Sequence, residues 1–442
     1  MRQKDINISN SLVYAGKKQE RDFNLFWFGF IIYTLSETLA EADSFFSFTA
    51  SQVVQTLGLV LMISVAISLI KFRIKNEYLK NVYYLYLFWL ITVALRGFKF
   101  DFNFIKSMLF SIDFGIFTYL VPFILLFPVN FAFYKKTFTA VFILGAAYLV
   151  YVALFFQQMR TYDRTDIASL ELIESFAGYL SLSVAFLLVT YIYHPLKKNV
   201  IAFVAMLVTL YFAIFRARRS LMFMSLSSLS FFLMSYLIIS KRTGYIIFLS
   251  AFIAIVGASY MQSLSNVGLF SYVMERGEDD TRSGVEVALY ADMSTQDWII
   301  GKGISGEYYC PGVEDVNDIG ATGYRGVIET GYLQIILKGG LISLVLLLLI
   351  LIPAIYKGFF KSNNLLSKGA AMWILLWVLY LYPTVYNTFT MHFLLVWVSV
   401  GICYSDEIRN MPESTLLEYF KSKITKPAKT IPLSRFLNKK QS

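Results

Sequence analysis

Long runs of apolar residues dominate the chain. Twelve runs of about membrane-crossing length lie near 23–42, 50–70, 81–98, 104–127, 137–158, 174–193, 198–215, 220–240, 244–262, 330–356, 369–387 and 389–405. A helix needs about 20 such residues to cross a bilayer. Barrel strands would alternate apolar and polar residues, whereas these runs are apolar on all sides, and in lipid only a helix satisfies their backbone. We therefore predict an all-α integral membrane protein, a polytopic bundle of about 12 transmembrane helices.

The composition agrees with this prediction. Of 442 residues, 57% are hydrophobic and 15% charged, against roughly 25% charged in a soluble domain. This excludes a soluble enzyme, a nucleic-acid-binding protein and a disordered chain. Cys310 and Cys403 make no disulfide framework, and His194 and His392 are far apart, so the sequence predicts no metal site and no cofactor.

The runs divide the chain into four regions. Residues 1–22 are too polar, and the next run too long, for a cleaved signal peptide. The last two crossings could instead form one bent, partly re-entrant segment around Pro383 and Asn387. The predicted regions are helices 1–9 in 1–262, a large periplasmic loop at 263–328, helices 10–12 in 329–405 and a basic cytoplasmic tail at 406–442.

Lysine and arginine predict the orientation. With a cytoplasmic N-terminus, 26 of the 39 basic residues fall on the inner side, and every inner hairpin carries at least two. Positive-inside sorting therefore places both termini on the cytoplasmic side of the membrane. The Lys-rich tail is interpreted as a solvated face attracted to anionic lipid.

The basic residues predicted on the outer side are mostly arginine, whereas those on the inner side are mostly lysine. The inner set holds 20 Lys and 6 Arg, but the outer set holds 4 Lys and 9 Arg. Sorting needs only positive charge, whereas arginine grips phosphate or carboxylate with two parallel hydrogen bonds. The outer arginines are therefore interpreted as binding residues. They are Arg96, Arg160, Arg164, Arg216, Arg218, Arg219, Arg276, Arg282 and Arg325.

Three of these arginines crowd one short outer turn. Arg216, Arg218 and Arg219 join the seventh and eighth crossings. They could reach lipid headgroups along their aliphatic stems. Alternatively, an anion neutralises their mutual repulsion, and we predict that they bind the diphosphate of a lipid-linked substrate.

A second group of polar residues lies where the large loop re-enters the membrane. Glu329 precedes the tenth crossing, with Tyr332 one turn below it and Arg325 one turn above it if the helix begins early. The carboxylate could activate a sugar hydroxyl as a general base, or it could pair with Arg325. Gly331, Gly339 and Gly340 are expected to permit close helix packing.

The loop at 263–328 is acidic and aromatic, with 11 acidic and 4 basic residues. A loop this long is uncommon without a role, and Trp298 and Tyr324 could stack on sugar rings. Arg276 and Arg282 flank the acidic run 278–280. This run is interpreted as local ion pairing rather than a metal site, because it lacks a paired D-x-D spacing.

Four more polar residues fall in or near the crossings. Asp113 lies within the predicted fourth crossing, where an acid suggests proton coupling. Glu37 and Glu41 share one face of the first crossing near its outer end. His392 is interpreted as a hydrogen-bonded structural histidine.

This layout resembles the O-antigen polymerase and O-antigen ligase superfamily. The resemblance covers the whole chain in its dozen crossings and late outer loop, and is sharper at 216–219, Glu329–Leu333 and Lys338–Leu341. It implies a metal-independent glycosyltransferase acting on undecaprenyl-diphosphate-linked glycan at the periplasmic face. Arg216, Arg219 and Arg282 would hold the diphosphate, and Glu329, supported by Arg325 and Tyr332, would lie near the acceptor hydroxyl.

The resemblance also favours a polymerase over the other functions considered. Ligases of the superfamily carry a histidine in the large loop, and 263–328 contains none, which favours a Wzy-type polymerase. Its product would be an O-antigen, capsule or exopolysaccharide, with a chain-length regulator as a candidate partner. The alternatives are a ligase that uses a lipid A-core acceptor, a flippase or other transporter of lipid-linked oligosaccharide, and a structural scaffold.

Overall fold

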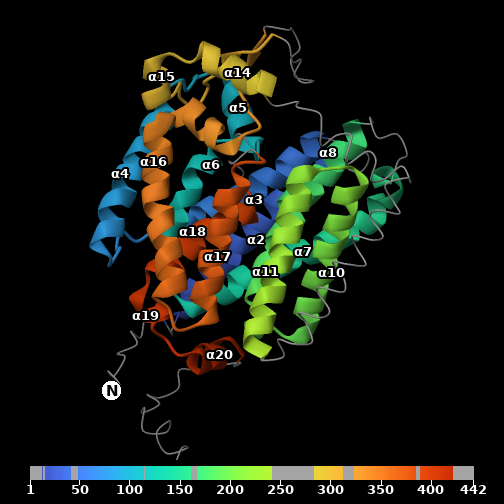
Figure 1. Cartoon of the computed structure of the whole chain (residues 1–442), viewed down its shortest axis with the longest axis vertical. Helices are drawn as coiled ribbons and strands as arrows, with labels where there is room; N and C mark the ends of the chain where they lie inside the picture. The colour runs from blue at the N-terminus through green and yellow to red at the C-terminus, as the bar shows by residue number, and fades with distance from the viewer. Residues whose placement is uncertain are drawn as a thin grey trace, which may run out of the picture.

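The computed structural model describes a bundle of helices with a small folded cap at one end (Figure 1). It describes Leu12 and residues 15–40, 48–113, 115–160, 167–240, 283–311, 323–384 and 389–421. Within these ranges, seven helical segments are long and apolar enough to cross a membrane: Lys17–Ala40, Ala50–Leu69, Glu77–Leu95, Phe131–Met159, Leu172–Val189, Leu196–Phe215 and Gly331–Phe360. The chain therefore has the architecture of a membrane protein. The predicted crossing at 244–262 lies outside the described residues.

The helices follow the apolar runs in order. The long ones are α2 (Lys17–Ala40), α3 (Phe48–Leu69), α4 (Glu77–Leu95), α7 (Phe131–Met159), α10 (Leu196–Phe215), α11 (Arg219–Ser240), α16 (Gly331–Phe360), α17 (Leu365–Tyr380) and α18 (Met391–Tyr404). Between α7 and α10, the helix α8 (Ile167–Phe176) continues through a π turn at Ala177–Ser181 and a 3-10 turn at Leu182–Val184 into α9 (Ala185–Val189).

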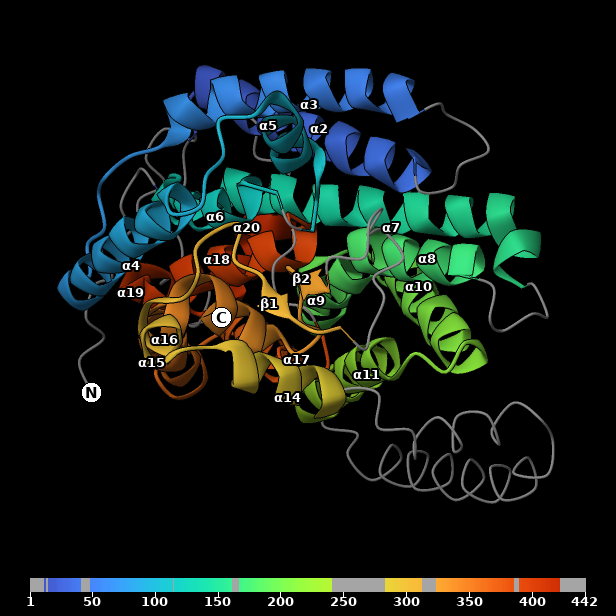
Figure 2. The same ribbon diagram turned by 90° about the horizontal axis from the view of Figure 1, so that it is seen from above.

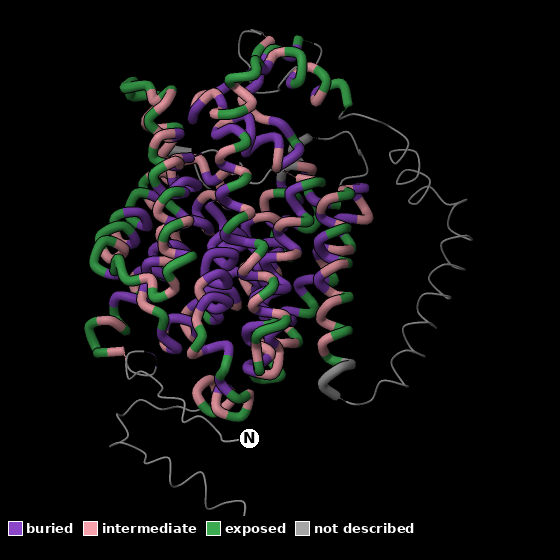
Figure 3. The backbone as a smooth tube through the Cα atoms, turned by 60° about the vertical axis from the view of Figure 1, so that its left-hand side comes forward, coloured by how far each residue is buried: buried purple, intermediate pink, exposed green. Residues whose placement is uncertain are grey.

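The outer faces of these helices are apolar. Exposed positions include Val53, Leu57 and Ile67 on α3, and Val345 and Ile352 on α16. Figure 3 shows the buried residues running through the middle of the bundle. A soluble helix turns a polar face outward, so this distribution supports contact between the bundle and lipid.

The first two long helices form a close hairpin along one flank, with α7 beside α2 (Figure 2). A Cβ at Gly29 would lie 2.6 Å from the Gly58 carbonyl oxygen, and one at Gly58 would lie 2.7 Å from that of Gly29. The two backbones therefore approach as closely as small residues permit in membrane helices.

The predicted fourth crossing at 104–127 is not a continuous helix. It consists of α5 (Phe102–Phe110), a turn, α6 (Phe117–Leu120) and the 3-10 helix η1 (Val121–Leu126). A Cβ at Gly115 would lie 2.1 Å from the Ser111 carbonyl oxygen, so the chain folds back tightly there. Asp113 therefore lies in a turn between helices rather than inside one continuous helix.

One end of the bundle, called here the tail end, carries α19 (Asp406–Arg409) and α20 (Glu413–Lys421). The ring centroids of Phe131 and Tyr419 lie 5.0 Å apart, and those of Tyr193 and Phe420 lie 5.1 Å apart. The Asn363 amide donates to the Arg409 carbonyl over 2.8 Å. The basic segments are predicted to share one side of the membrane. Those that the structure describes therefore meet at this end: 71–80, 135–136, 197–198 and 357–368. Lys241 and Arg242 lie outside the described residues.

Candidate functional site at the loop end

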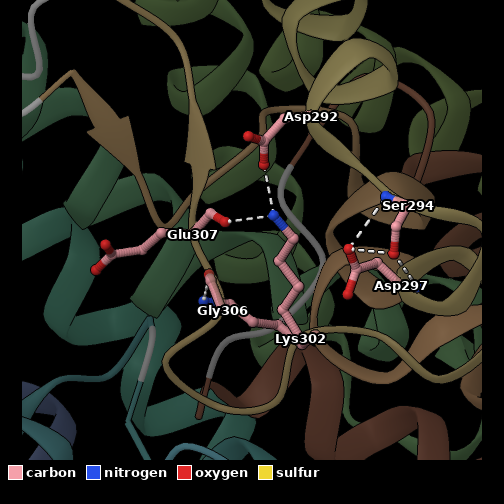
Figure 4. A network of polar contacts seen from close by, with 7 residues as sticks. Asp292, Ser294, Asp297, Lys302, Gly306 and Glu307 are labelled. Atoms are coloured by element: carbon pink, nitrogen blue, oxygen red, sulfur yellow. Dashed lines mark hydrogen bonds and ion pairs between the residues drawn. The ribbon is translucent and has the colours of Figure 1, made fainter.

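The opposite end, the loop end, carries a cap built from α14 (Ser283–Asp292), α15 (Thr295–Ile300), and the strands β1 (Tyr308–Tyr309) and β2 (Tyr324–Arg325). A capping box begins α15, in which the Asp297 amide donates to Ser294 Oγ and the Ser294 amide donates back to the Asp297 carboxylate. Lys302 Nζ donates to Asp292 over 2.5 Å and to the Glu307 carbonyl over 3.1 Å (Figure 4). These contacts fold the part of the loop at 292–307 into a defined structure.

Two glycines seat the cap on the bundle. Gly340 adopts φ 69°, and a Cβ there would lie 2.0 Å from the Ile299 carbonyl oxygen. Gly301, at φ 71°, faces the backbone of Gly339 and Gly340. Gly340 thus packs closely as expected, and its partner is the short helix α15 within the large loop. The φ of Gly340 interrupts α16, so the first turns of α16 belong to the cap contact.

Helix α4 fixes the same contact from the side. The Arg96 guanidinium donates to the carbonyls of Ile300 and Gly301, the latter over 3.0 Å. The Trp89 indole donates to the Gly339 carbonyl over 2.9 Å. Burial lowers the pKa of Arg96. Arg96, which the sequence grouped with possible anion-binding arginines, therefore has a role in anchoring the cap.

Arg325 lies in a two-residue ribbon rather than on a helix. Strand β2 pairs antiparallel with β1, with Arg325 opposite Tyr308 and Tyr324 opposite Tyr309. Arg325 is buried, whereas the Tyr309 and Tyr324 rings are half-exposed, with centroids 5.3 Å apart. Helix α16 begins at Gly331, so the predicted helical turn between Arg325 and Glu329 is wrong.

A carboxylate that the sequence analysis did not single out lies beside the start of α16. Thr330 Oγ1 donates to Glu286 on α14 over 2.5 Å, and Tyr290 also hydrogen-bonds with Glu286. Burial, and then the charge of Glu286, raise the pKa of Tyr290. Tyr332 is half-buried and interacts electrostatically with both, while Glu329 is exposed.

The predicted sugar-binding aromatic residues occupy the same cap. Trp298 is half-buried and stacks on Tyr290 with centroids 5.7 Å apart and planes inclined by 30°. The Tyr309–Tyr324 pair lies on the ribbon. Exposed aromatic faces of this kind are a surface on which a sugar ring can stack.

The three arginines of the turn at 216–219 have three different environments. Arg216 is 2% exposed, and its guanidinium donates to Ser169 Oγ. Arg218 forms an ion pair of 2.9 Å with Glu174 on α8. Arg219 is exposed at the start of α11. Between them Ala217 adopts φ 51°, a left-handed conformation that is costly for a residue with a Cβ. The turn is thus held in place by the buried Arg216–Ser169 contact and the partly exposed Arg218–Glu174 ion pair, and it presents Arg219 outward.

Asp113 belongs to the same region. It accepts a hydrogen bond of 2.8 Å from Tyr179 in the π turn. Burial raises the pKa of Asp113 to about 6, the Tyr179 hydrogen bond opposes this shift, and the charge of Glu174 adds to it. The Asp113 carboxylate therefore takes up a proton close to neutral pH.

The end of α17 connects the two groups of predicted residues. Tyr380 interacts electrostatically with Ser220, next to Arg219, and with Glu174. The next residue, Leu381, accepts a hydrogen bond of 2.7 Å from the Gly331 amide. Two consecutive residues, Tyr380 at the end of α17 and Leu381 directly after it, thus connect the arginine turn with the segment around Glu329.

Other predicted residues lie elsewhere or outside the description. Arg276, Arg282 and Glu41 are outside the described residues. Gln55 donates to Glu37. His392 is buried with its ring edge-on to Trp373, 4.9 Å between centroids, and its Nε2 has no hydrogen-bond partner in the described chain. The interpretation of this residue as hydrogen-bonded does not hold for that nitrogen.

Glu286, Glu174 and Tyr380 are the residues that sequence reasoning missed. The spacing of Glu286 and Tyr290, four residues apart, could have indicated one helix face. Nothing in the sequence relates Glu174 to Arg218. Over the part of the chain that the structure describes, no group of three or more metal-ligating side chains occurs. Comparison with models of known families, with curated proteins and with solved structures finds no match to this chain.

Proposed function

We propose that this chain polymerises undecaprenyl-diphosphate-linked oligosaccharide repeat units into a surface polysaccharide at the periplasmic face of a bacterial inner membrane. In this proposal the chain crosses about twelve times, both termini are cytoplasmic and the loop end is periplasmic. Support comes from the separation of charge: the described Lys-rich segments meet at the tail end, while the arginine turn and the cap meet at the loop end.

The observation that carries the proposal is the junction at the end of α17. Through Tyr380 and Leu381, it joins the arginine turn to the segment around Glu329. Transfer of a glycan needs an anion-binding group for the leaving diphosphate and a base for the acceptor within one site. The junction holds candidates for both groups against the same element.

Arginine supplies the first of these groups. Arg219 is exposed, Arg218 lies beside it in an ion pair with Glu174, and Arg216 holds the turn through Ser169. Guanidinium hydrogen bonds stabilise the charge that grows on the departing diphosphate. Arg276 and Arg282 are further diphosphate ligands in the proposal.

Glu329 supplies the second group. As the acceptor hydroxyl oxygen attacks the anomeric carbon, its proton passes to Glu329. The bond from that carbon to the diphosphate breaks, and the diphosphate leaves with the electron pair. Arg325 and Tyr332 support Glu329, while the faces of Trp298 and Tyr324 bind the glycan. No metal takes part.

The distribution of ionisable groups argues against a transporter. Transporters place such groups near the middle of several helices. Here Asp113, Glu174, Arg218 and Arg219 gather at the loop end. This arrangement suits chemistry at a surface better than passage through the bundle.

Deletion of the gene tests the proposal, with the surface glycan separated on a gel. Loss of a polymerase leaves single repeat units attached at the surface. Loss of a ligase or a flippase leaves no repeat there, and an unchanged ladder of chain lengths would contradict all three functions. Purified chain in nanodiscs should also lengthen undecaprenyl-diphosphate-linked repeats without added metal.

A further inference from the structure

The tail end holds a groove that the proposed reaction does not use. An apolar cavity of about 220 Å³ lies between α2, α3, η1 and α18. Phe26, Met62, Val121 and Phe127 form its buried wall, and the exposed Ile67 lies at its open side. The groove has the wholly apolar lining of a site for a hydrocarbon chain.

A polar cavity of about 350 Å³ adjoins the apolar one. Gln19, Lys71, Arg73 and Asn76 line it, and Phe127 lines both cavities. Its position beside α19, through Glu407, places it at the tail end. The two cavities therefore lie next to each other at Phe127, one wholly apolar and one with basic residues at its mouth.

The charge of this mouth is positive. Lys75 pairs with Glu407 over 2.5 Å. Lys71 and Arg73 are exposed and form no ion pair with any residue that the structure describes. The extended segment 70–76 carries both, and the Lys71 amide donates to the Leu126 carbonyl over 2.9 Å, which fixes the segment against η1. Among the described residues, the carboxylate at this mouth, Glu407, is thus paired with Lys75, and no ion pair balances Lys71 and Arg73.

We infer that the paired cavities bind an anionic phospholipid, with one acyl chain in the apolar groove and the phosphodiester headgroup against Lys71 and Arg73. Basic pockets between membrane helices select anionic headgroups. A zwitterionic phospholipid such as phosphatidylcholine balances its phosphate with its own ammonium group, so it brings no net negative charge to Lys71 and Arg73.

The polyprenyl carrier of the proposed reaction is a poorer occupant. Its diphosphate would lie against Arg219, at the loop end, whereas the cations of the groove lie at the tail end. A single carrier molecule cannot place its one charged group at both ends. This comparison of occupants uses the proposed diphosphate site, whereas the inference itself is argued from the two cavities and their cations.

Native mass spectrometry of the purified full chain tests the inference, with phosphatidylglycerol, phosphatidylcholine and undecaprenyl phosphate as separate probes. The parent chain should bind phosphatidylglycerol most tightly. The double variant Lys71→Ala/Arg73→Ala should lose about 30-fold in affinity, as expected for two basic residues near an anionic lipid. The matched control Lys361→Ala/Lys368→Ala, which removes two exposed lysines of the same end outside both cavities, should bind like the parent.

A second pair of variants tests the groove itself. Ile67→Trp should fill the open side and weaken phosphatidylglycerol about 10-fold, whereas Ile352→Trp, on the exposed face of α16, should not. Equal binding of phosphatidylglycerol by the parent and by the Lys71/Arg73 variant would overturn the inference. Preference for undecaprenyl phosphate or for phosphatidylcholine would overturn it as well.

Discussion

The backbone amide of Gly331 donates a hydrogen bond of 2.7 Å to the carbonyl of Leu381. Gly331 begins α16 two residues after Glu329, and Leu381 follows Tyr380, which interacts with Ser220. The Gly331–Leu381 bond ties the start of one helix to the end of another at the loop end. The segment of Glu329 and the arginine turn therefore both lie against the end of α17.

Arg219 tests the proposed diphosphate site because it is the exposed arginine of its turn. We expect Arg219→Ala to lower kcat/KM for repeat-unit polymerisation by roughly 10- to 100-fold, the range for loss of a hydrogen bond to a charged group. Arg219→Lys should recover part of this loss, because lysine keeps the charge but not the paired donors. Chain lengthening by purified protein measures the effect.

Arg160→Ala is the matched control for Arg219. Arg160 is also exposed and follows α7 at the loop end. Its removal should leave polymerisation unchanged. Equal losses at the two positions would mean that general surface charge, rather than a site at 216–219, supports the reaction.

Substitutions of Glu329 and Glu286 distinguish the proposed general base from a carboxylate that only holds the position of α16. Glu329→Gln should lower kcat by about 100- to 10,000-fold if Glu329 is the general base. Glu286 is already engaged by Thr330 and Tyr290, so Glu286→Gln should act through the position of α16 and cause a smaller loss. Single-turnover rates of the two variants give the comparison, and a larger loss for Glu286→Gln would move the base to Glu286.

Gly340 tests the attachment of the cap. Gly340→Ala places a Cβ at a position 2.0 Å from the Ile299 carbonyl oxygen and at φ 69°, so we expect a destabilisation of about 2 kcal/mol or more. Gly284→Ala, where a Cβ would meet open space, should change stability by less than about 0.5 kcal/mol. Thermal melting and protease cleavage within 301–307 check both variants. Equal protection of 301–307 in the two variants would refute the close contact.

The helices were predictable from the sequence because lipid leaves an apolar run few alternatives. The run at 330–356 corresponds to α16 and the run at 137–158 to α7. The interruption at 111–116 was missed although Ser111, Asp113 and Gly115 are residue types typical of turns, because the apolar residues on both sides add up to the length of one crossing. The π turn at Ala177–Ser181 left no clear signal, because it lies within an apolar run.

The candidate site was predictable only in part. Side chains such as Arg216 and Arg219 carry identical charges in the sequence, but a bond to Ser169, 47 residues earlier, buries the first and leaves the second exposed. The cap shows the same limit, since Glu286 gains its position only when α14 packs beside Thr330. Local pattern identifies the residue types, and tertiary contacts decide which of them face a substrate.

Asp113 gives the stability of the chain a defined pH dependence. Burial raises its pKa to about 6, above the value of about 3.9 for an unfolded aspartate, so folding favours the protonated form. The resulting stabilisation is complete below about pH 4 and is lost as the pH rises through about 6.

Asp113→Asn keeps an oxygen that can accept from Tyr179 but cannot ionise. We therefore expect the variant to escape a loss of about 2 kcal/mol between pH 4 and 7 and to melt at a higher temperature than the parent at pH 7. Melting in detergent across this range measures the difference, with Glu77→Gln, an exposed carboxylate of the tail end, expected to follow the parent. Identical profiles for Asp113→Asn and the parent would show that the Asp113 carboxylate stays solvated in the folded chain.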